Sequence, residues 1–382
     1  AEPGPLIEPP AAADDESVQS IANALAAPAK AAILLGGRAL REPALRHAAR
    51  IAVKLGIPLL AETFPTRLER GAGIPAVERL AYLADMAGVQ MKGLETLVLV
   101  DAKAPVSFFA YPGKKSDLVP EGCRVLTLSS PQQDAVASLE KLSRLLDAGN
   151  AEPVLAPAVR AGRPRGRKLT AEKVCKAVGH LLPENAILID EAISSGLMLG
   201  KFTAGCPRHD LITLTGGAIG QGLPNAVGAA IACPERRVVA LIGDGSAMYT
   251  IQALWTLARE QLDVTCVIFN NAAYSVLNVE LERVGAAGAG ARARAQFDLD
   301  RPSLNFAALA QGMGVSASRT AETGDFVRAL EAALCRRGPT LIEAIVPPAL
   351  SGLKLKLLPR LLGAMDGMPL PVARMLKRKL AP

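Results

Sequence analysis

Aromatic residues are scarce in this sequence: phenylalanine, tryptophan and tyrosine together make up 3% of its 382 residues. So few aromatic rings argue against the stacking platforms on which proteins bind single-stranded nucleic acids. The sequence also lacks an uninterrupted apolar run of roughly 18 residues, the length of a membrane-spanning helix, and it does not open on a signal segment. We therefore predict a cytoplasmic protein with no membrane partner.

Clustered metal-ligating side chains are lacking as well. The six cysteines are scattered and none forms a CxxC pair, which argues against a zinc site and indicates reduced thiols. The three histidines, His47, His180 and His209, are isolated in the sequence. They therefore suggest neither a catalytic triad nor a histidine metal cluster.

The surplus of positive charge, a net +7, is confined to two segments. Residues 160–168 carry five positive charges, and residues 354–379 carry seven against the single Asp366, so the remaining chain is mildly acidic. The run GRPRGRK at 162–168 resembles an AT-hook, in which arginines enter a narrow minor groove. A single basic run between folded domains is more typical of a solvated linker, and we predict no nucleic-acid partner.

What the sequence does contain is an alternation of short apolar runs with amphipathic segments, typical of strands alternating with helices. In the first half, strands are predicted at 31–35, 57–61, 97–100 and 125–128, and helices at 42–55, 76–91 and 132–146. This alternation implies βαβ units and an open, doubly wound parallel sheet. We expect residues 1–22 to be a linker and residues 23–150 to form a central Rossmann-like domain.

A second alternating block follows a stretch rich in Ala, Pro, Gly and Arg at 151–169, which we interpret as a basic interdomain linker. Helices are predicted at 170–182, 224–232, 249–260, 304–311 and 325–334, and strands at 187–189, 238–242, 264–269 and 340–346. The fold class is thus α/β with two doubly wound parallel-sheet domains, the second spanning residues 170–347. The Gly/Ala-rich residues 285–295 are predicted to form a mobile surface loop.

The remaining residues, 348–382, alternate apolar and basic side chains and form a C-terminal arm. An amphipathic basic helix could contact an anionic membrane. Pro359, Pro369 and Pro371 are expected to interrupt any long helix of that kind. We therefore favour an arm that closes over the active site or packs against a partner.

The most informative segment is VVALIGDGSAMYTIQALWTLAREQLDVTCVIFNN at residues 238–271. Asp244 follows an apolar strand between Gly243 and Gly245, which allow a sharp turn and close approach of a ligand. Ser246 falls near the start of the next helix, where free N–H groups favour phosphate. Asp244 and Asn271 should both lie at carboxyl ends of parallel strands, where ligands of α/β sheets bind. Their hard oxygen donors suit Mg²⁺, and we predict Mg²⁺ holding a diphosphate.

The run GDGS followed by a helix, a strand and NN resembles the metal–diphosphate motif of thiamine diphosphate-dependent enzymes. The upstream run TLTGGAIGQGLPNAVGAAIA at 213–232 is similar to the acetolactate synthase and benzoylformate decarboxylase branch of that family. The resemblance spans about residues 20–347 and implies thiamine diphosphate and Mg²⁺ as cofactors. It implies that the metal ligands are Asp244, the side chain of Asn271 and the backbone carbonyl of Ala273.

The same resemblance implies the residues that contact the cofactor. They are Ser194, Gly217, Ile219, Gly243, Gly245, Ser246, Asn271, Tyr274, Ser275, Val276 and Leu277. Ile219 matches the bulky aliphatic residue that bends the cofactor, so that the pyrimidine amino group reaches the thiazolium C2 proton. The alternative for Ile219 is an ordinary core isoleucine.

The resemblance also shows what this chain does not match. In the family an N-terminal domain supplies a glutamate that activates the aminopyrimidine, and none of Glu62, Glu191 or Glu280 matches its place. We therefore assign no catalytic acid or base, and we expect the chain alone to bind Mg²⁺ and diphosphate without turnover. The segments that accompany FAD in acetolactate-forming relatives are not found, so we predict that FAD is not bound.

The resemblance implies decarboxylation of a small 2-keto acid. The favoured interpretation is an acetolactate synthase-like enzyme, which joins the product of decarboxylation to a second carbonyl compound. The alternatives are a benzoylformate decarboxylase-like enzyme that releases an aldehyde and a non-catalytic cofactor-binding subunit. In the full-length protein, we expect a homodimer or a homotetramer.

Overall fold

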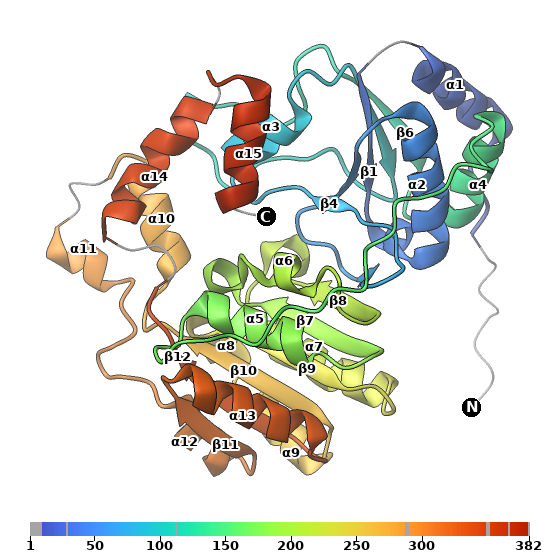
Figure 1. Cartoon of the computed structure of the whole chain (residues 1–382). Coiled ribbons are helices and arrows are strands. Elements are labelled where there is room, and N and C mark those ends of the chain that lie inside the picture. The colour runs from blue at the N-terminus through green and yellow to red at the C-terminus, as the bar shows by residue number, and fades with distance from the viewer. Residues whose placement is uncertain are drawn as a thin grey trace, which may run out of the picture. The chain divides into compact units, whose positions relative to one another are not determined.

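The computed structural model describes residues 10–27, 30–111, 113–286, 290–348, 352–365 and 367–380 (Figure 1). The chain divides into two compact units. The first comprises Ala1–Arg67, Ile74–Ser107 and Asp117–Leu155, and the second comprises Leu68–Gly73, Phe108–Ser116 and Ala156–Pro382. Two short segments of the first half of the sequence, 68–73 and 108–116, thus belong to the second unit.

The first unit is built on a five-stranded parallel sheet with the strand order β4-β2-β1-β5-β6. Its strands are β1 (Ala31–Leu35), β2 (Leu59–Ala61), β4 (Glu78–Arg79), β5 (Thr96–Val100) and β6 (Arg124–Ser129). Its helices are α1 (Asp15–Ala26), η1 (Gly37–Leu40), α2 (Glu42–Leu55), α3 (Ala84–Met91) and α4 (Ala135–Leu145). All five side chains of β1, AAILL, are buried, as expected for a central strand covered on both faces.

Two predictions for this unit were wrong. Residues 1–22 are not simply a linker, because α1 begins at Asp15 after Asp14, whose carboxylate accepts the Ser17 N–H at 2.7 Å. Residues 76–91 do not form one helix, because Glu78–Arg79 pair with β2 as strand β4 and α3 begins only at Ala84. In this second case, pairing at the sheet edge outweighs the local helical pattern.

The second unit is built on a seven-stranded sheet with the order β11-β12-β10-β9-β7-β8-β3. Its strands are β3 (Leu68–Arg70), β7 (Ala186–Glu191), β8 (His209–Thr213), β9 (Val238–Gly243), β10 (Val264–Asn270), β11 (Ser316–Thr320) and β12 (Thr340–Ile345). All neighbours are parallel except β3, which pairs antiparallel with β8. The α/β fold with parallel sheets is confirmed, whereas this antiparallel edge strand was not predicted.

The second unit contains helices of different lengths, some of which cover the two faces of its sheet (Figure 1). The helices of this unit are α5 (Ala171–Leu181), η2 (Ile193–Gly196), α6 (Leu199–Thr203), η3 (Thr215–Gly217), α7 (Gly222–Ala232), α8 (Asp244–Thr250), α9 (Ala253–Arg259), α10 (Ser275–Arg283), α11 (Ala291–Ala295), α12 (Phe306–Gly312), α13 (Thr323–Cys335), α14 (Gly352–Met365) and α15 (Leu370–Leu380). Alternate strand residues such as Val238, Ala240 and Ile242 pack with α7, α9 and α12 in one buried cluster.

Three local features of this unit differ from the sequence predictions. Two helices replace the single helix expected at 249–260. The first, α8, begins earlier, at Asp244, and ends at Thr250, and the second, α9, begins at Ala253. Within residues 285–295, the last five form α11, whereas 287–289 lie outside the described residues. Pro359 lies inside α14 and Pro371 in the first turn of α15, where a missing N–H is tolerated.

The basic segment at 160–168 lies within the second unit, and two of its arginines bind neighbouring parts of that unit. The Arg160 guanidinium donates to the carbonyls of His180 and Leu182 at 3.1 and 3.0 Å. Arg167 pairs with Glu322 at 2.9 Å.

Within the described ranges, no helix is both long enough and apolar enough to cross a bilayer.

His209, the first residue of β8, provides a test of the packing of this sheet. Burial lowers the pKa of His209 from 6.5 to about 4, and in the described part of the chain its Nε2 has no hydrogen-bond partner. Between these pH values the unfolded chain binds more protons, so the folded state loses stability as the pH falls from 6.5 towards 4. Relative to a His209→Asn variant, the wild type should lose about 3 kcal/mol over this range.

Urea unfolding of both chains at pH 7 and at pH 4 measures this difference. The two chains must be compared because the buried Asp244 carboxyl also titrates in this range. Its pKa is raised to about 6, so it makes the folded state more stable as the pH falls and offsets part of the effect of His209. Equal pH dependence in the wild type and the variant would contradict the buried, neutral state of His209.

Candidate functional site

The candidate site lies at the carboxyl ends of three adjacent parallel strands of the second unit. Strand β9 leads directly into α8 at Asp244, and its neighbour β10 ends at Asn270 before Asn271. On the other side of β9, strand β7 ends at Glu191 before the short helix η2. Because the strands run in parallel, the residues that follow them share one edge of the sheet.

Asp244 is the centre of a hydrogen-bond network at this edge. Its Oδ2 accepts the backbone N–H groups of Asn271 and Ala272 at 2.9 and 2.7 Å, and its Oδ1 accepts that of Gly245 at 2.8 Å. The backbone of Ala272 is in the left-handed region, with φ of 57°. The loop after β10 is thereby held against the start of α8, as the sequence spacing predicted.

The electrostatic environment of Asp244 disfavours a bare negative charge. The residue is 2% exposed, and burial raises the pKa of its carboxyl to about 6 despite the backbone N–H groups that lower it. Among the described residues, no lysine or arginine forms an ion pair with it. A buried carboxylate without a cationic partner is a suitable ligand for a metal ion, because the ion would supply the missing positive charge.

Asn271 lies beside Asp244 and is also buried. Its Oδ1 accepts the N–H of Ala273 at 3.0 Å and the hydroxyl of Ser275 at 3.3 Å, and its Nδ2 donates to the Ser195 hydroxyl at 3.4 Å. Two predicted residues, Ala273 and Ser275, therefore join the same network. The orientation of the Asn271 amide is fixed by partners on both of its atoms.

Ser195 was missed by sequence reasoning, which selected its neighbour Ser194. Ser195 is buried and contacts Asn271, whereas Ser194 is half-buried in the same turn of η2. Only the fold distinguishes the two, because consecutive serines in a short helix carry the same sequence signal. Both remain at the edge of the sheet that carries Asp244.

Gly245 and Tyr274 are in direct contact. A Cβ atom at Gly245 would lie 2.4 Å from Cε1 of the Tyr274 ring, so the ring occupies the space beside this glycine. Burial and the nearby Tyr249 and Asp244 raise the pKa of the Tyr274 hydroxyl. Gly243 caps α8 in an extended conformation, and Ser246 is buried in the first turn of that helix.

The remaining predicted residues lie on two neighbouring segments. Val276 and Leu277 are half-buried in the first turn of α10, which begins at Ser275. Gly217, with φ of 73°, is the last residue of η3, and the half-buried Ile219 lies in the turn between η3 and α7. A Cβ at Gly217 would meet the ring of Phe108 at 3.4 Å. Ile219 does not belong to the buried cluster beneath α7, which argues against the interpretation as a core isoleucine.

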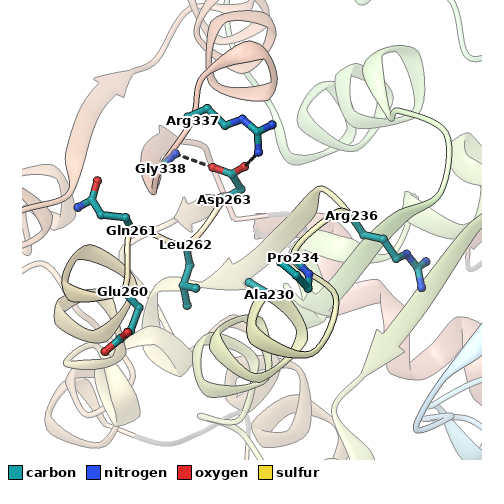
Figure 2. A pocket seen from close by; sticks show the side chains of 9 residues that line it. All are labelled: Ala230, Pro234, Arg236, Glu260, Gln261, Leu262, Asp263, Arg337 and Gly338. Carbon is teal, nitrogen blue, oxygen red and sulfur yellow. Dashed lines mark hydrogen bonds and ion pairs between the residues drawn. The ribbon is translucent and has the colours of Figure 1, made fainter.

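Two other kinds of feature could form a site, namely a cluster of metal-ligating side chains and a surface pocket. No group of three or more His, Cys, Asp and Glu side chains suited to a metal occurs among the described residues. A pocket does open at the opposite, amino-terminal edge of the sheet, where Asp263 pairs with Arg337 and accepts the Gly338 N–H, each at 2.6 Å (Figure 2). The charged side chains that line this pocket are all engaged in ion pairs, since Arg236 pairs with Asp210 and Glu260 with Arg259, and the pocket lies at the opposite edge of the sheet from Asp244.

Comparison with known proteins relates this geometry to a family. Residues 196–344 match the C-terminal TPP binding domain of thiamine pyrophosphate enzymes. The matched range includes β9, α8 and β10, and with them Asp244, Asn271 and Ile219. The resemblance stated from the sequence is thereby confirmed.

Relatives and solved structures extend the match beyond this domain. The chain is 51% identical over 338 residues to a protein of Mycobacterium tuberculosis provisionally named acetolactate synthase large subunit IlvX, covering 88% of this chain and 65% of that protein. It is 30% identical over 299 residues to benzoylformate decarboxylase of Pseudomonas aeruginosa, covering 73% and 53%. The chain thus spans between half and two thirds of the length of these relatives.

A solved structure shares the fold. The thiamine diphosphate-dependent 4-hydroxybenzoylformate decarboxylase of Rhodococcus jostii RHA1 superposes with a TM-score of 0.72 at 24% identity. The alignment covers 90% of this chain and 66% of that one. The likeness therefore includes both α/β units.

Proposed function

Because this chain belongs to the thiamine diphosphate-dependent enzymes through its C-terminal domain, we propose that it binds Mg²⁺ and the diphosphate of that cofactor at Asp244 and Asn271. The observation that carries the proposal is the buried Asp244 carboxylate, which has no cationic partner among the described residues and lies beside the Asn271 amide. The proposal extends to the reaction class, a Mg²⁺-dependent conversion of a small 2-keto acid.

The donor set fits Mg²⁺ rather than a softer metal. Asp244 offers a carboxylate, Asn271 an amide oxygen and Ala273 a backbone carbonyl, all of them hard oxygen ligands. No cysteine or histidine is included. We propose these three groups as the protein ligands, with the remaining positions left for diphosphate oxygens and water.

The cradle for the diphosphate also fits. Gly245 and Ser246 lie in the first turn of α8, whose N–H groups and dipole favour a negatively charged group. Gly243 precedes them in an extended conformation. We propose that Ser194 and the residues from Tyr274 to Leu277 border the same cradle, and that Gly217 and Ile219 contact the rings.

When bound, thiamine diphosphate supplies an electron sink for cleavage of the bond next to a keto carbon. The role that we assign to Ile219 is to hold the cofactor bent, and that of Asp244 and Asn271 is to fix its diphosphate. No residue of this chain is assigned the activation of the aminopyrimidine. We therefore propose that the 382-residue chain by itself binds the cofactor without turning over a keto acid.

The structure of the first unit supports our prediction that FAD is not bound there. A dinucleotide phosphate would approach the carboxyl end of β1, at the switch point between β1 and β5. There the Asp101 carboxylate accepts the Arg38 N–H at 2.6 Å, and the Glu62 carboxylate accepts the Gly37 N–H at 3.3 Å. The N–H groups that a phosphate would need are thus bonded to the protein's own carboxylates.

Two product outcomes follow from the relatives' names, and the 51% identity to the acetolactate synthase-like protein favours carboligation over simple release of an aldehyde. We propose a homodimer or homotetramer for the full-length protein and a cytoplasmic location. A non-catalytic cofactor-binding subunit is the competing function, and it differs in one measurable property, the release of CO₂.

The reaction class is tested with the natural polypeptide isolated from its source, whose mass is measured first. We expect CO₂ release from pyruvate or benzoylformate that requires both Mg²⁺ and thiamine diphosphate. Acetolactate from pyruvate would identify a synthase, and benzaldehyde from benzoylformate would identify a decarboxylase. If the cofactor binds but neither keto acid loses CO₂, the enzymatic proposal is wrong. The purified 382-residue chain serves as the control, and we expect it to be inactive.

A further inference from the structure

Glu191, the last residue of β7, is a buried carboxylate to which the assignments above give no role. It is 1% exposed, and its oxygens are directed at the turn that precedes α7. Its Oε1 accepts the N–H of Gly220, and its Oε2 accepts that of Gly222 at 2.8 Å. In the described part of the chain, no lysine or arginine pairs with Glu191, so backbone N–H groups are its principal partners.

The same turn is held from its other side by α8. The hydroxyl of Thr250, the last residue of α8, donates to the carbonyl of Gly220 at 2.6 Å. Gly220 has φ of 95°, and a Cβ atom there would lie 2.6 Å from Cβ of Tyr249. Gly220 is therefore fixed between the end of β7 and the end of α8.

Close packing leaves the turn little freedom. A Cβ at Gly222 would lie 2.5 Å from Oε2 of Glu191 and 2.5 Å from Cδ1 of Ile242, so both ends of the turn press against buried groups. Ile219 is the residue immediately before Gly220. Its position relative to Asp244 is thus set by one carboxylate and by the helix that Asp244 itself begins.

From this geometry we propose that Glu191 is a positioning residue that, together with Thr250, holds Ile219 at a fixed place relative to the Asp244 end of α8. The proposal rests on the proposed function, because it concerns the part of the cofactor beyond the diphosphate. Glu191 itself contacts neither the metal nor the diphosphate in this account.

A carboxylate suits this task for a simple reason. Two backbone N–H groups converge on Glu191 and each bonds to a different oxygen, so both terminal atoms of the side chain must be acceptors. A glutamine would turn its NH₂ group towards one of these donors and leave a buried N–H without a partner, which is costly. The Glu191→Gln variant therefore releases the turn with almost no change in side-chain volume.

The test compares two ligands by calorimetric titration of the 382-residue chain. Mg²⁺ with inorganic pyrophosphate reports on the diphosphate half alone, and Mg²⁺ with thiamine diphosphate reports on the whole cofactor. We expect Glu191→Gln to weaken binding of thiamine diphosphate about tenfold while changing pyrophosphate binding by less than about twofold, since the diphosphate contacts are intact. Ile219→Ala should have the same selective effect.

Two further variants keep the test independent of folding. Thr250→Val removes the second hold on Gly220 without altering Glu191, and it should weaken thiamine diphosphate binding selectively. Asp210→Asn is the matched control, because Asp210 is also a buried carboxylate of this sheet but pairs with Arg236 at 2.6 Å at the opposite edge. It should leave the ratio of the two affinities unchanged, even if it lowers the stability of the chain.

The outcomes separate this proposal from the proposed function. If Glu191→Gln and Thr250→Val weaken both ligands equally or weaken neither, Glu191 does not position Ile219. If Asp244→Asn leaves both ligands bound as in the wild type, the proposed metal and diphosphate site is wrong instead. Hydrogen exchange at residues 217–222 provides an independent reading, since the positioning role requires faster exchange of this turn in Glu191→Gln.

Discussion

Replacing Asp244 with asparagine is expected to abolish Mg²⁺-dependent binding of thiamine diphosphate. The substitution removes the charge of a buried carboxylate. This carboxylate has no cationic partner among the described residues, so a bound metal ion would be its counter-charge. The substitution also turns an NH₂ group towards N–H groups that now donate to Oδ1 and Oδ2. A neutral amide binds Mg²⁺ far more weakly than a carboxylate, and we expect affinity to fall at least about a hundredfold, or about 2.7 kcal/mol.

Calorimetry and thermal unfolding measure this effect together. A ligand that binds only the folded state raises the unfolding temperature, so Mg²⁺ with pyrophosphate should stabilise the wild type and not the variant. Asp263→Asn is the matched control, because Asp263 likewise accepts a backbone N–H, that of Gly338, but at the amino-terminal edge of the same sheet (Figure 2). Unchanged binding in Asp244→Asn would remove the assignment of the metal site.

Replacing Gly245 with alanine is expected to destabilise the chain and to disturb the diphosphate cradle. The new Cβ would lie 2.4 Å from Cε1 and 2.6 Å from Cδ1 of the Tyr274 ring, closer than any real contact. Either the ring or the start of α8 must move, and such overpacking costs about 1 to 3 kcal/mol. Because both groups border the proposed cradle, weaker binding of Mg²⁺ with pyrophosphate should accompany the loss of stability.

A second substitution shows whether the Tyr274 ring is the cause. In the Gly245→Ala/Tyr274→Ala double variant the clash is gone, and the cost of the added methyl group should disappear relative to Tyr274→Ala alone. Gly228→Ala in α7 is the control, because nothing lies within 4 Å of its Cβ and alanine is favoured over glycine in a helix by about 0.5 to 1 kcal/mol. Equal costs of Gly245→Ala with and without Tyr274 would contradict the contact.

The central part of the site could be predicted because it depends on local pattern and on one rule of topology. The apolar runs before Asp244 and Asn271 mark buried strands, and a single crossover of this length returns the chain to a parallel neighbour. That rule brings the two residues to one edge of the sheet, and the structure places their hydrogen bond there at 2.9 Å. Local sequence and fold therefore agree at this motif.

What escaped prediction depends on contacts between distant residues. Glu191 and Ser195 have roles only because β7 lies beside β9, and nothing in their own neighbourhood distinguishes them from other buried or turn residues. Segment 68–73 supplies β3 to the second sheet although it lies within the first half of the chain. Helix α1 was not predicted because the segment before it is acidic and rich in proline, which is typical of a linker. The helical spacing of the buried Val18, Ile21 and Leu25 follows only after that segment.

The segment 108–116 illustrates the same limit. It belongs to the second unit, where the Tyr111 hydroxyl donates to Glu280 of α10 at 2.7 Å. The Arg283 guanidinium stacks on the Tyr111 ring, with its Cζ 4.0 Å from the ring centroid. Pairings across about 170 residues of sequence leave no periodic signal, so only the fold reveals them.

The measurement that tests the account most directly is a titration of the wild-type chain with thiamine diphosphate, once with Mg²⁺ and once with the metal removed by a chelator. We predict saturable binding with Mg²⁺ and its loss without the metal, because the proposed ligands Asp244, Asn271 and Ala273 reach the diphosphate only through the ion. Binding of equal strength with and without Mg²⁺, or none in either case, would contradict the proposed site.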